Sequence, residues 1–177
     1  MLIWILLVSI ANNISFLADS YIDKLNPPQT TDLLLGILPK HDFSKVLEIL
    51  MILTSIIFIF YIFKTNQLQK APFYFFLFLS FAYIRILFMT LTPLKSPFDG
   101  NFGILYNYLP NSGMFPSGHL SVPIMSFFVA HYNKHKLYSS IFWILSWSIG
   151  FLMLFSKGHY TIDLLGTFFI AYFLVNF

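Results

Sequence analysis

Six apolar runs, separated by short polar loops, constrain the fold of this chain more than any other feature. Each run approaches or reaches the roughly 17–25 residues that a helix needs to cross about 30 Å of hydrocarbon. Hydrophobic residues make up 58% of the 177 positions and charged residues 10%, more apolar side chain than a soluble domain of this length can bury. We therefore predict an all-α, polytopic membrane protein, a bundle of six transmembrane helices. The runs cover residues 1–17, 46–63, 72–91, 118–132, 137–155 and 160–177.

The predicted bundle is one unit, because no internal repeat and no long linker divides the sequence. Residues 1–177 are thus expected to form a single membrane domain. The first run is read as a helix and not as a cleaved signal peptide, since it lacks a basic n-region and a small-x-small cleavage site. The ten basic residues are scattered, which argues against nucleic acid as a partner. Without cysteine the chain has no disulfides and no thiolate metal ligands.

Lysines in the loops predict how the bundle is oriented. Lys64 and Lys70 lie in the second loop and Lys134 and Lys136 in the fourth, and neither loop carries an acidic residue. The segment 18–45 mixes three lysines with four aspartates, and the loops after the third and fifth runs carry one lysine each. Because lysine and arginine concentrate in cytoplasmic loops, both termini are predicted to be cytoplasmic and the odd loops to lie outside.

Two short motifs then fall at the same outer face: FPSGH at 115–119 and GHYTID at 158–163. His159 and Asp163 are four residues apart, so they share a helix face and can hydrogen-bond. Pairing offsets the roughly 2.5–3.5 kcal/mol that an ionised carboxylate costs inside a membrane helix; the alternative is an Asp163 solvated among headgroups. A histidine oriented by a carboxylate and facing a second histidine, His119, suits phosphoryl transfer.

Three further residues are candidate phosphate ligands. Arg85 is the only arginine and lies inside an apolar run, where it either faces a polar cavity or snorkels to the interface. Ser117 can cap the helix that follows, and Gly118 allows close approach of a ligand to the backbone. The N–H groups at such a helix N-terminus bind anions.

The pair His131 and His135 has the spacing of a zinc-binding helix, but no glutamate follows the first histidine and no third ligand is evident. We assign it to a basic cytoplasmic loop and expect no metal and no other cofactor.

The two motifs resemble those of the type-2 phosphatidic acid phosphatase superfamily of six-helix membrane enzymes. Within it, HYTID, the stretch 85–97 (RILFMTLTPLKSP) and the stretch 11–39 are similar to the sphingomyelin synthase branch, which transfers ceramide head groups. The phosphatases' lysine-to-arginine-proline motif is absent in its usual form, and Pro116 is more typical of phosphatases than of synthases.

The resemblance implies roles for the candidate residues. His159, polarised by Asp163, would attack the lipid phosphorus, and His119 would protonate the leaving alkoxide and then activate the acceptor hydroxyl. Arg85 and the backbone of Ser117 and Gly118 would steady the phosphate charge. Ser156-Lys157 stands directly before Gly158 where the family has a more distant Ser-Arg pair, so Lys157 either supplies that charge or is a surface residue.

The expected function is a metal-independent lipid phosphotransferase that moves a phospho-head group from a glycerophospholipid to a lipid alcohol, ceramide or diacylglycerol. Two alternatives stay open: a lipid phosphate or pyrophosphate phosphatase with water as acceptor, and a catalytically idle lipid-binding membrane protein. The expected partners are the bilayer and these lipids, and the expected location is a bacterial plasma membrane with an extracytoplasmic site. A Golgi-type membrane fits the same pattern, and the sequence does not indicate an oligomeric state.

Overall fold

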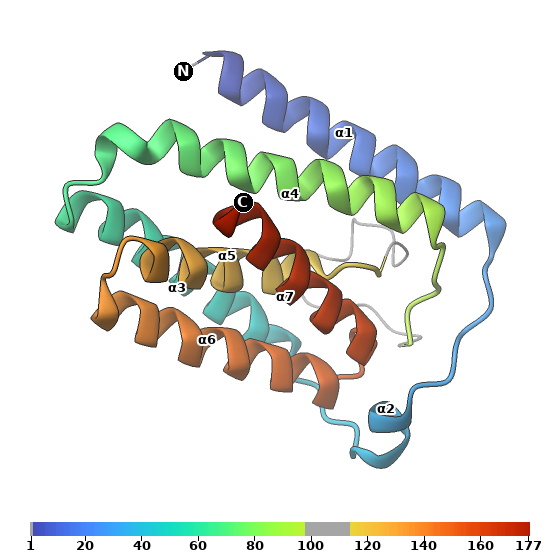
Figure 1. Ribbon diagram of the computed structural model, residues 1–177. Coiled ribbons are helices and arrows are strands. Elements are labelled where there is room, and N and C mark those ends of the chain that lie inside the picture. The colour runs from blue at the N-terminus through green and yellow to red at the C-terminus, as the bar shows by residue number, and fades with distance from the viewer. Residues whose placement is uncertain (1, 98–113) are drawn as a thin grey trace.

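The computed structural model describes residues 2–97 and 114–177, and in these two stretches it consists of helices joined by loops, with no strand. Figure 1 shows the long helices lying roughly side by side, with the short α2 beyond one end of the bundle. The helices are α1 (Leu2–Leu25), α2 (Leu33–Ile37), α3 (Ser44–Lys64), the 3₁₀ turn η1 (Leu68–Lys70), α4 (Ala71–Leu91), α5 (Gly118–Tyr132), α6 (Lys136–Phe155) and α7 (Thr161–Asn176).

Every predicted apolar run is helical in its described residues, apart from Tyr160 and Phe177 at the two ends of the last run, so the all-helical prediction is confirmed. The main difference is in α1, which continues to Leu25 although its apolar run ends at residue 17. Hydropathy marks where a segment stops being apolar, whereas a helix continues as long as its backbone stays hydrogen-bonded. The extension carries Asp19 and Asp23 on a regular helix.

Local sequence signals set the helix starts that matter for the site. Ser117 has extended backbone angles, and its hydroxyl accepts a hydrogen bond from the N–H of Leu120 at 3.4 Å, which caps α5. Tyr160 occupies the cap position of α7, and the Asp163 carboxylate accepts from its N–H at 2.8 Å. This backbone bond anchors the carboxylate one turn inside α7.

The core lies between α3, α4, α5, α6 and α7. Helix α5 packs against α6 and α7, α3 packs against α5 and α6, and α4 joins this group to α1 at the edge of the molecule (Figure 1). Tyr61, Met125, Val129 and Phe142 are fully buried in the largest apolar cluster. The packing leaves the α6–α7 turn and the start of α5 at one end of the bundle, where the two motifs meet.

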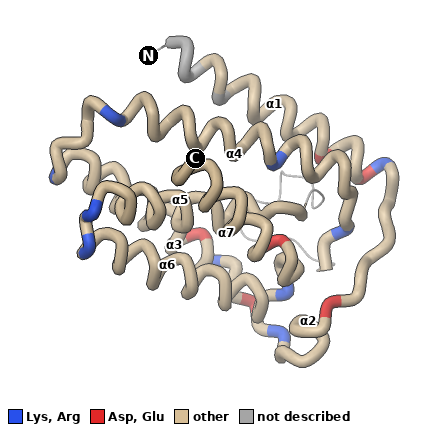
Figure 2. The backbone as a smooth tube through the Cα atoms, viewed as in Figure 1, with Lys and Arg blue, Asp and Glu red and all other residues tan. Residues whose placement is uncertain are grey.

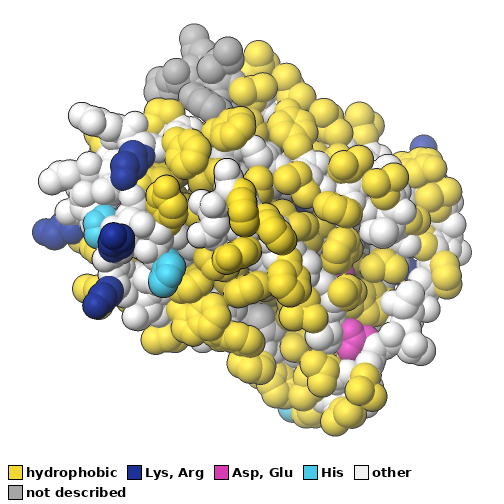
Figure 3. All heavy atoms as spheres, in the orientation of Figure 1, with side chains coloured by type: hydrophobic (Ala, Val, Ile, Leu, Met, Phe, Trp, Pro, Cys, Tyr) yellow, Lys and Arg dark blue, Asp and Glu magenta, His cyan; other side chains and the backbone are white. Residues whose placement is uncertain are grey.

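Three helical segments of the described residues are long and apolar enough to cross a membrane: Ser44–Lys64, Leu68–Leu91 and Lys136–Phe155. Thr161–Asn176 is a shorter apolar helix. The count of six spans and the cytoplasmic placement of the termini stay predictions. Figure 3 shows apolar side chains covering the flank of the bundle, with basic and histidine side chains gathered toward one end. A helical bundle with such an apolar flank fits a membrane protein.

Candidate active site

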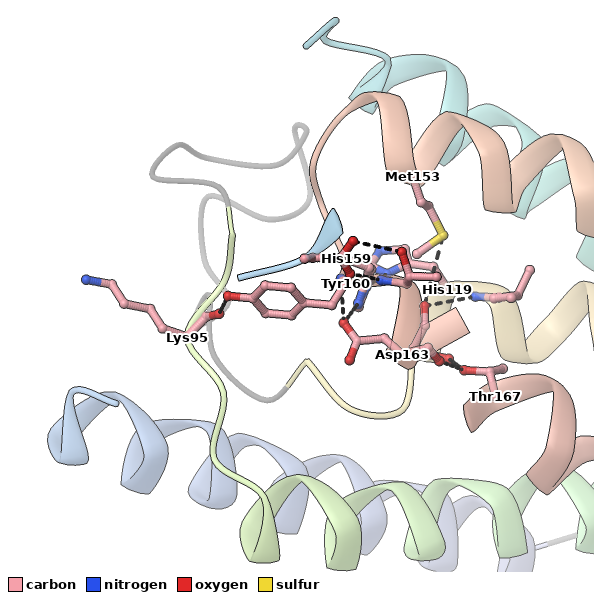
Figure 4. A network of polar contacts seen from close by, with 11 residues as sticks. Lys95, His119, Met153, His159, Tyr160, Asp163 and Thr167 are labelled. Carbon is pink, nitrogen blue, oxygen red and sulfur yellow. Dashed lines mark hydrogen bonds and ion pairs between the residues drawn. The ribbon is translucent and has the colours of Figure 1, made fainter. Parts of the chain in front are cut away.

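The two histidines and the aspartate predicted from the motifs come together at the N-terminal ends of α5 and α7 (Figure 4). Nδ1 of His159 lies 3.1 Å from Oδ2 of Asp163, and Nε2 of His159 lies 3.4 Å from Nδ1 of His119. The two imidazole rings meet edge to face, with centroids 5.6 Å apart and an interplanar angle of 67°. The His159 ring thus contacts the Asp163 carboxylate through Nδ1 and the His119 ring through Nε2.

The carboxylate of Asp163 selects the tautomer of the His159 ring. Asp163 has 0% exposure, and its Oδ2 accepts both the N–H of Tyr160 and the Nδ1 proton of His159. Because the carboxylate accepts, Nδ1 carries the proton and Nε2 of the neutral ring keeps its lone pair. The nitrogen of His159 that keeps its lone pair is therefore the one that faces His119.

Backbone contacts hold the two motifs against one another. The N–H of Ser117 donates to the carbonyl of Asp163 at 3.3 Å, and the hydroxyl of Thr167 donates to the carbonyls of Ser117 at 3.1 Å and Asp163 at 2.7 Å. Ser117, Asp163 and Thr167 each have 0% exposure. In this structure Ser117 serves as a helix cap and as a link between α5 and α7; its assignment to phosphate binding is a separate prediction.

Phe115 packs the same loop against its neighbours. Its ring meets Phe88 of α4 at right angles, with centroids 5.8 Å apart. A Cβ added to Gly166 of α7 would lie 2.3 Å from Cε2 of Phe115, so α7 has room for this ring only because residue 166 is glycine.

Arg85 of α4 reaches the start of α5. A Cβ on Gly118 would lie 3.2 Å from Nε of Arg85, so the guanidinium lies directly beside the glycine that precedes His119. Its Nη1 donates to the hydroxyl of Ser15 in α1 at 3.2 Å. The carboxylates of Asp19 and Asp163 both act on this guanidinium electrostatically. The one arginine of the chain therefore lies beside the start of α5, and both interpretations of its role stay predictions.

Lys157 lies in the turn between α6 and α7, half-buried and with a positive φ of 53°. It lines an open groove of about 680 Å³ together with Pro97, Tyr160 and most of the segment 29–37. The groove is next to the turn that carries His159 and is lined by neither histidine. Both roles proposed for Lys157 thus stay open.

Several residues at the site were not found by reasoning from the sequence. Asp32, in the loop before α2, accepts from the N–H of Thr161 at 2.7 Å and from its hydroxyl at 3.0 Å. The Tyr160 hydroxyl donates to the carbonyl of Lys95 at 2.9 Å and accepts from the N–H of Thr30 at 3.3 Å. The Thr-Asp pair before the apolar LLLG stretch signals a helix cap, but nothing in the sequence indicates a partner about 130 positions away.

Ser15 and Asp19 were missed as well, although they stand four residues apart and share one face of α1. The two other histidines of interest lie elsewhere. His135 Nδ1 is 3.1 Å from the hydroxyl of Tyr61, and His131 is exposed at the far end of α5.

The fold and the site together describe a class: an all-helical protein with apolar helices suited to a membrane, and a carboxylate-oriented histidine beside a second histidine at one end. Residues 114–177 match the family described as PAP2 superfamily C-terminal. The matched region contains the whole of FPSGH and the whole of GHYTID, together with the helices α5, α6 and α7 that hold them. The match supports a relation to the type-2 phosphatidic acid phosphatase superfamily and to lipid phosphatase or phosphotransferase chemistry. Neither a curated protein nor a solved structure matched the chain.

Proposed function

We propose that this protein is an integral-membrane lipid phosphotransferase that moves a phospho-head group from a glycerophospholipid to a lipid alcohol, ceramide or diacylglycerol. The observation that carries the proposal is the position of His159 between Asp163 and His119, with hydrogen-bonding distances of 3.1 Å and 3.4 Å. The similarity of residues 114–177 to the PAP2 superfamily supports phosphorus as the atom that reacts. We also propose that the protein belongs to the sphingomyelin synthase branch and that its site lies on the extracytoplasmic side of a bacterial plasma membrane.

In the first half-reaction, Nε2 of His159 attacks the lipid phosphorus. A P–N bond forms while the P–O bond to the glycerol oxygen breaks, and protonated His119 gives its proton to that oxygen, so that diacylglycerol leaves. In the second half-reaction, neutral His119 takes the proton of the acceptor hydroxyl. The acceptor oxygen then attacks phosphorus, the P–N bond breaks, and His159 is restored. Asp163 holds the Nδ1 proton of His159 and stabilises the positive charge that develops on its ring.

The contact between the two rings describes the resting site. Nε2 of His159 and Nδ1 of His119 are 3.4 Å apart, which is a hydrogen-bonding distance and too short to admit a phosphoryl group. Substrate binding must therefore move the His119 ring away from Nε2, after which phosphate oxygens occupy the space between the rings. Arg85, beside Gly118, is placed to meet the charge on those oxygens.

Hydrolysis is the second candidate, because water in place of the lipid alcohol would use the same residues, and Pro116 before Ser-Gly-His favours it. The test is to incubate the purified protein with a head-group-labelled phospholipid, with and without ceramide or diacylglycerol, and to follow the products. New labelled lipid that requires the added alcohol supports transfer. Labelled water-soluble phosphate ester supports the phosphatase.

His159→Ala is the matched variant and is expected to abolish turnover, since no other residue replaces the nucleophile. His131→Ala is the control, because that histidine is exposed and lies at the other end of α5. Full activity of His159→Ala would rule out the mechanism. No turnover of any phosphate ester by the wild-type protein would leave the lipid-binding alternative.

A further inference from the structure

The loop before α2 is fastened to the turn that carries His159. Asp32 contributes four hydrogen bonds: its Oδ1 accepts from the N–H groups of Leu34 and Leu35 and from the hydroxyl of Thr161, and its Oδ2 accepts from the N–H of Thr161. The first two cap α2 within its own segment. The last two connect this segment to the first residue of α7, 129 positions further along the chain.

The connection acts where the orientation of His159 is set. The first N–H groups of a helix have no partner within that helix, and the carboxylate of Asp32 accepts the one on Thr161. The neighbouring N–H, on Tyr160, is accepted by Asp163 itself. Asp32 and Asp163 therefore hold consecutive peptide groups of the turn, and His159 directly precedes them.

The environment of Asp32 favours its charged form. Partial burial raises the pKa of Asp32, but the hydrogen bonds from Thr161, Leu35 and Leu34 lower it by more, so the pKa lies below its ordinary value. A charged carboxylate at the start of α7 also interacts favourably with the helix dipole. The same segment is tied a second time, through the N–H of Thr30 and the Tyr160 hydroxyl.

We propose that Asp32 is a positioning residue, which fixes the turn at Thr161 so that Nε2 of His159 is aimed at the phosphorus. The inference rests on the proposed function for its effect on turnover, while the contact itself exists independently of the substrate. Asp32 touches neither histidine in any described hydrogen bond and acts only through the backbone of α7. Misplacing a reacting group by about 1 Å can cost on the order of a hundredfold in rate.

Asp32→Asn separates the two tasks of the side chain. The amide oxygen can keep the cap on α2, whereas the amide NH₂ meets the N–H of Thr161, donor against donor, and that bond is lost. Asp42→Asn is the matched control, because Asp42 is exposed and accepts from the N–H of Ser44 in its own segment. We expect Asp32→Asn to lower kcat about tenfold to a hundredfold with KM nearly unchanged, and Asp42→Asn to leave both unchanged.

Thr161 provides a second pair. Thr161→Val removes the hydroxyl bond to Asp32 and keeps the N–H bond, so it is expected to lower kcat less than Asp32→Asn does. Thr161→Ser retains both donors, the N–H and the hydroxyl, and is expected to keep the wild-type kcat. If kcat followed the size of the side chain instead, with Thr161→Val fully active and Thr161→Ser impaired, this result would contradict the role assigned to the hydrogen bonds.

A measurement without turnover keeps this test separate from that of the reaction. Diethyl pyrocarbonate modifies the neutral nitrogen of histidine, and mass spectrometry of the digested protein gives the rate at His159. We expect Asp32→Asn to change this rate at least severalfold relative to wild type and Asp42→Asn. Thermal unfolding in detergent shows whether all three proteins are folded. Wild-type kcat, or wild-type reactivity of His159, in folded Asp32→Asn would overturn the proposal. If the wild type transfers no head group, the proposed function is wrong. The modification rate at His159 then still tests whether Asp32 positions that residue.

Discussion

At the scale of single residues, one oxygen atom organises the site. Oδ2 of Asp163 accepts the N–H of Tyr160 at 2.8 Å and contacts Nδ1 of His159 at 3.1 Å. The other oxygen, Oδ1, is buried and has no hydrogen-bond partner among the residues that the structure describes. A buried carboxylate oxygen without a partner is costly, and a catalytic role for the charge would account for that cost.

Asp163→Asn tests whether the charge of this side chain matters beyond its hydrogen bonds. The amide oxygen can occupy the position of Oδ2 and keep both bonds, so the fold and the α7 cap should survive. Without the negative charge, the positive charge that develops on His159 is no longer stabilised, and we expect kcat to fall about a hundredfold or more. The measurement is kcat on the labelled phospholipid, beside thermal unfolding in detergent to show that the variant is folded. A folded variant with wild-type kcat would remove Asp163 from the mechanism.

At the scale of helices, the site depends on how closely α7 approaches the loop before α5. A methyl group at residue 166 would overlap the ring of Phe115, with 2.3 Å to Cε2 and 2.7 Å to Cζ. Gly150, within α6, has no atom within 4 Å of the position of an added Cβ. The two glycines are therefore a matched pair in consecutive helices, one with a tight contact and one without.

We expect Gly166→Ala to lower both stability and activity, because the Phe115 ring must move and carries the FPSGH loop with it. Overpacking of this kind typically costs about 1–3 kcal/mol. Gly150→Ala should be neutral or stabilising by up to about 1 kcal/mol, since alanine is the better helix former. Thermal unfolding midpoints and kcat of both variants check this. A Gly166→Ala protein as stable and active as Gly150→Ala would show that the contact with Phe115 does not position the loop.

The helices also show which parts of the structure can be predicted from sequence. Length and hydropathy were enough to find the long helices, and a spacing of four residues was enough to pair His159 with Asp163. The end of α1 was missed, because residues 18–25 continue the helix after the apolar run has ended. The contact of Asp32 with Thr161 was missed because it joins a loop to the start of a distant helix, and neither periodicity nor spacing records which segments meet.

At the scale of the whole molecule, the two ends of the bundle differ in chemistry. The turns between α3 and α4 and between α5 and α6 carry basic residues and no acidic ones at one end. The other end, with α2 and the turn between α6 and α7, carries both acidic and basic residues (Figure 2). The histidine pair belongs to the second end. Because short loops with an excess of lysine favour the cytoplasmic side, we predict that the first end is cytoplasmic and that the site faces outward.

Cysteine labelling tests this orientation, and the chain suits it because it contains no cysteine of its own. Lys95→Cys and Lys136→Cys are the matched variants: both side chains are exposed, Lys95 in the loop after α4 and Lys136 at the start of α6. Only the backbone carbonyl of Lys95 contacts Tyr160, so the first substitution keeps that bond. In intact bacterial cells we expect a membrane-impermeant maleimide to label Lys95→Cys and to label Lys136→Cys only after permeabilisation, with the cysteine-free protein unlabelled throughout. The reverse pattern would place the histidine pair on the cytoplasmic side, and equal labelling of both variants in intact cells would contradict a bundle that spans the membrane.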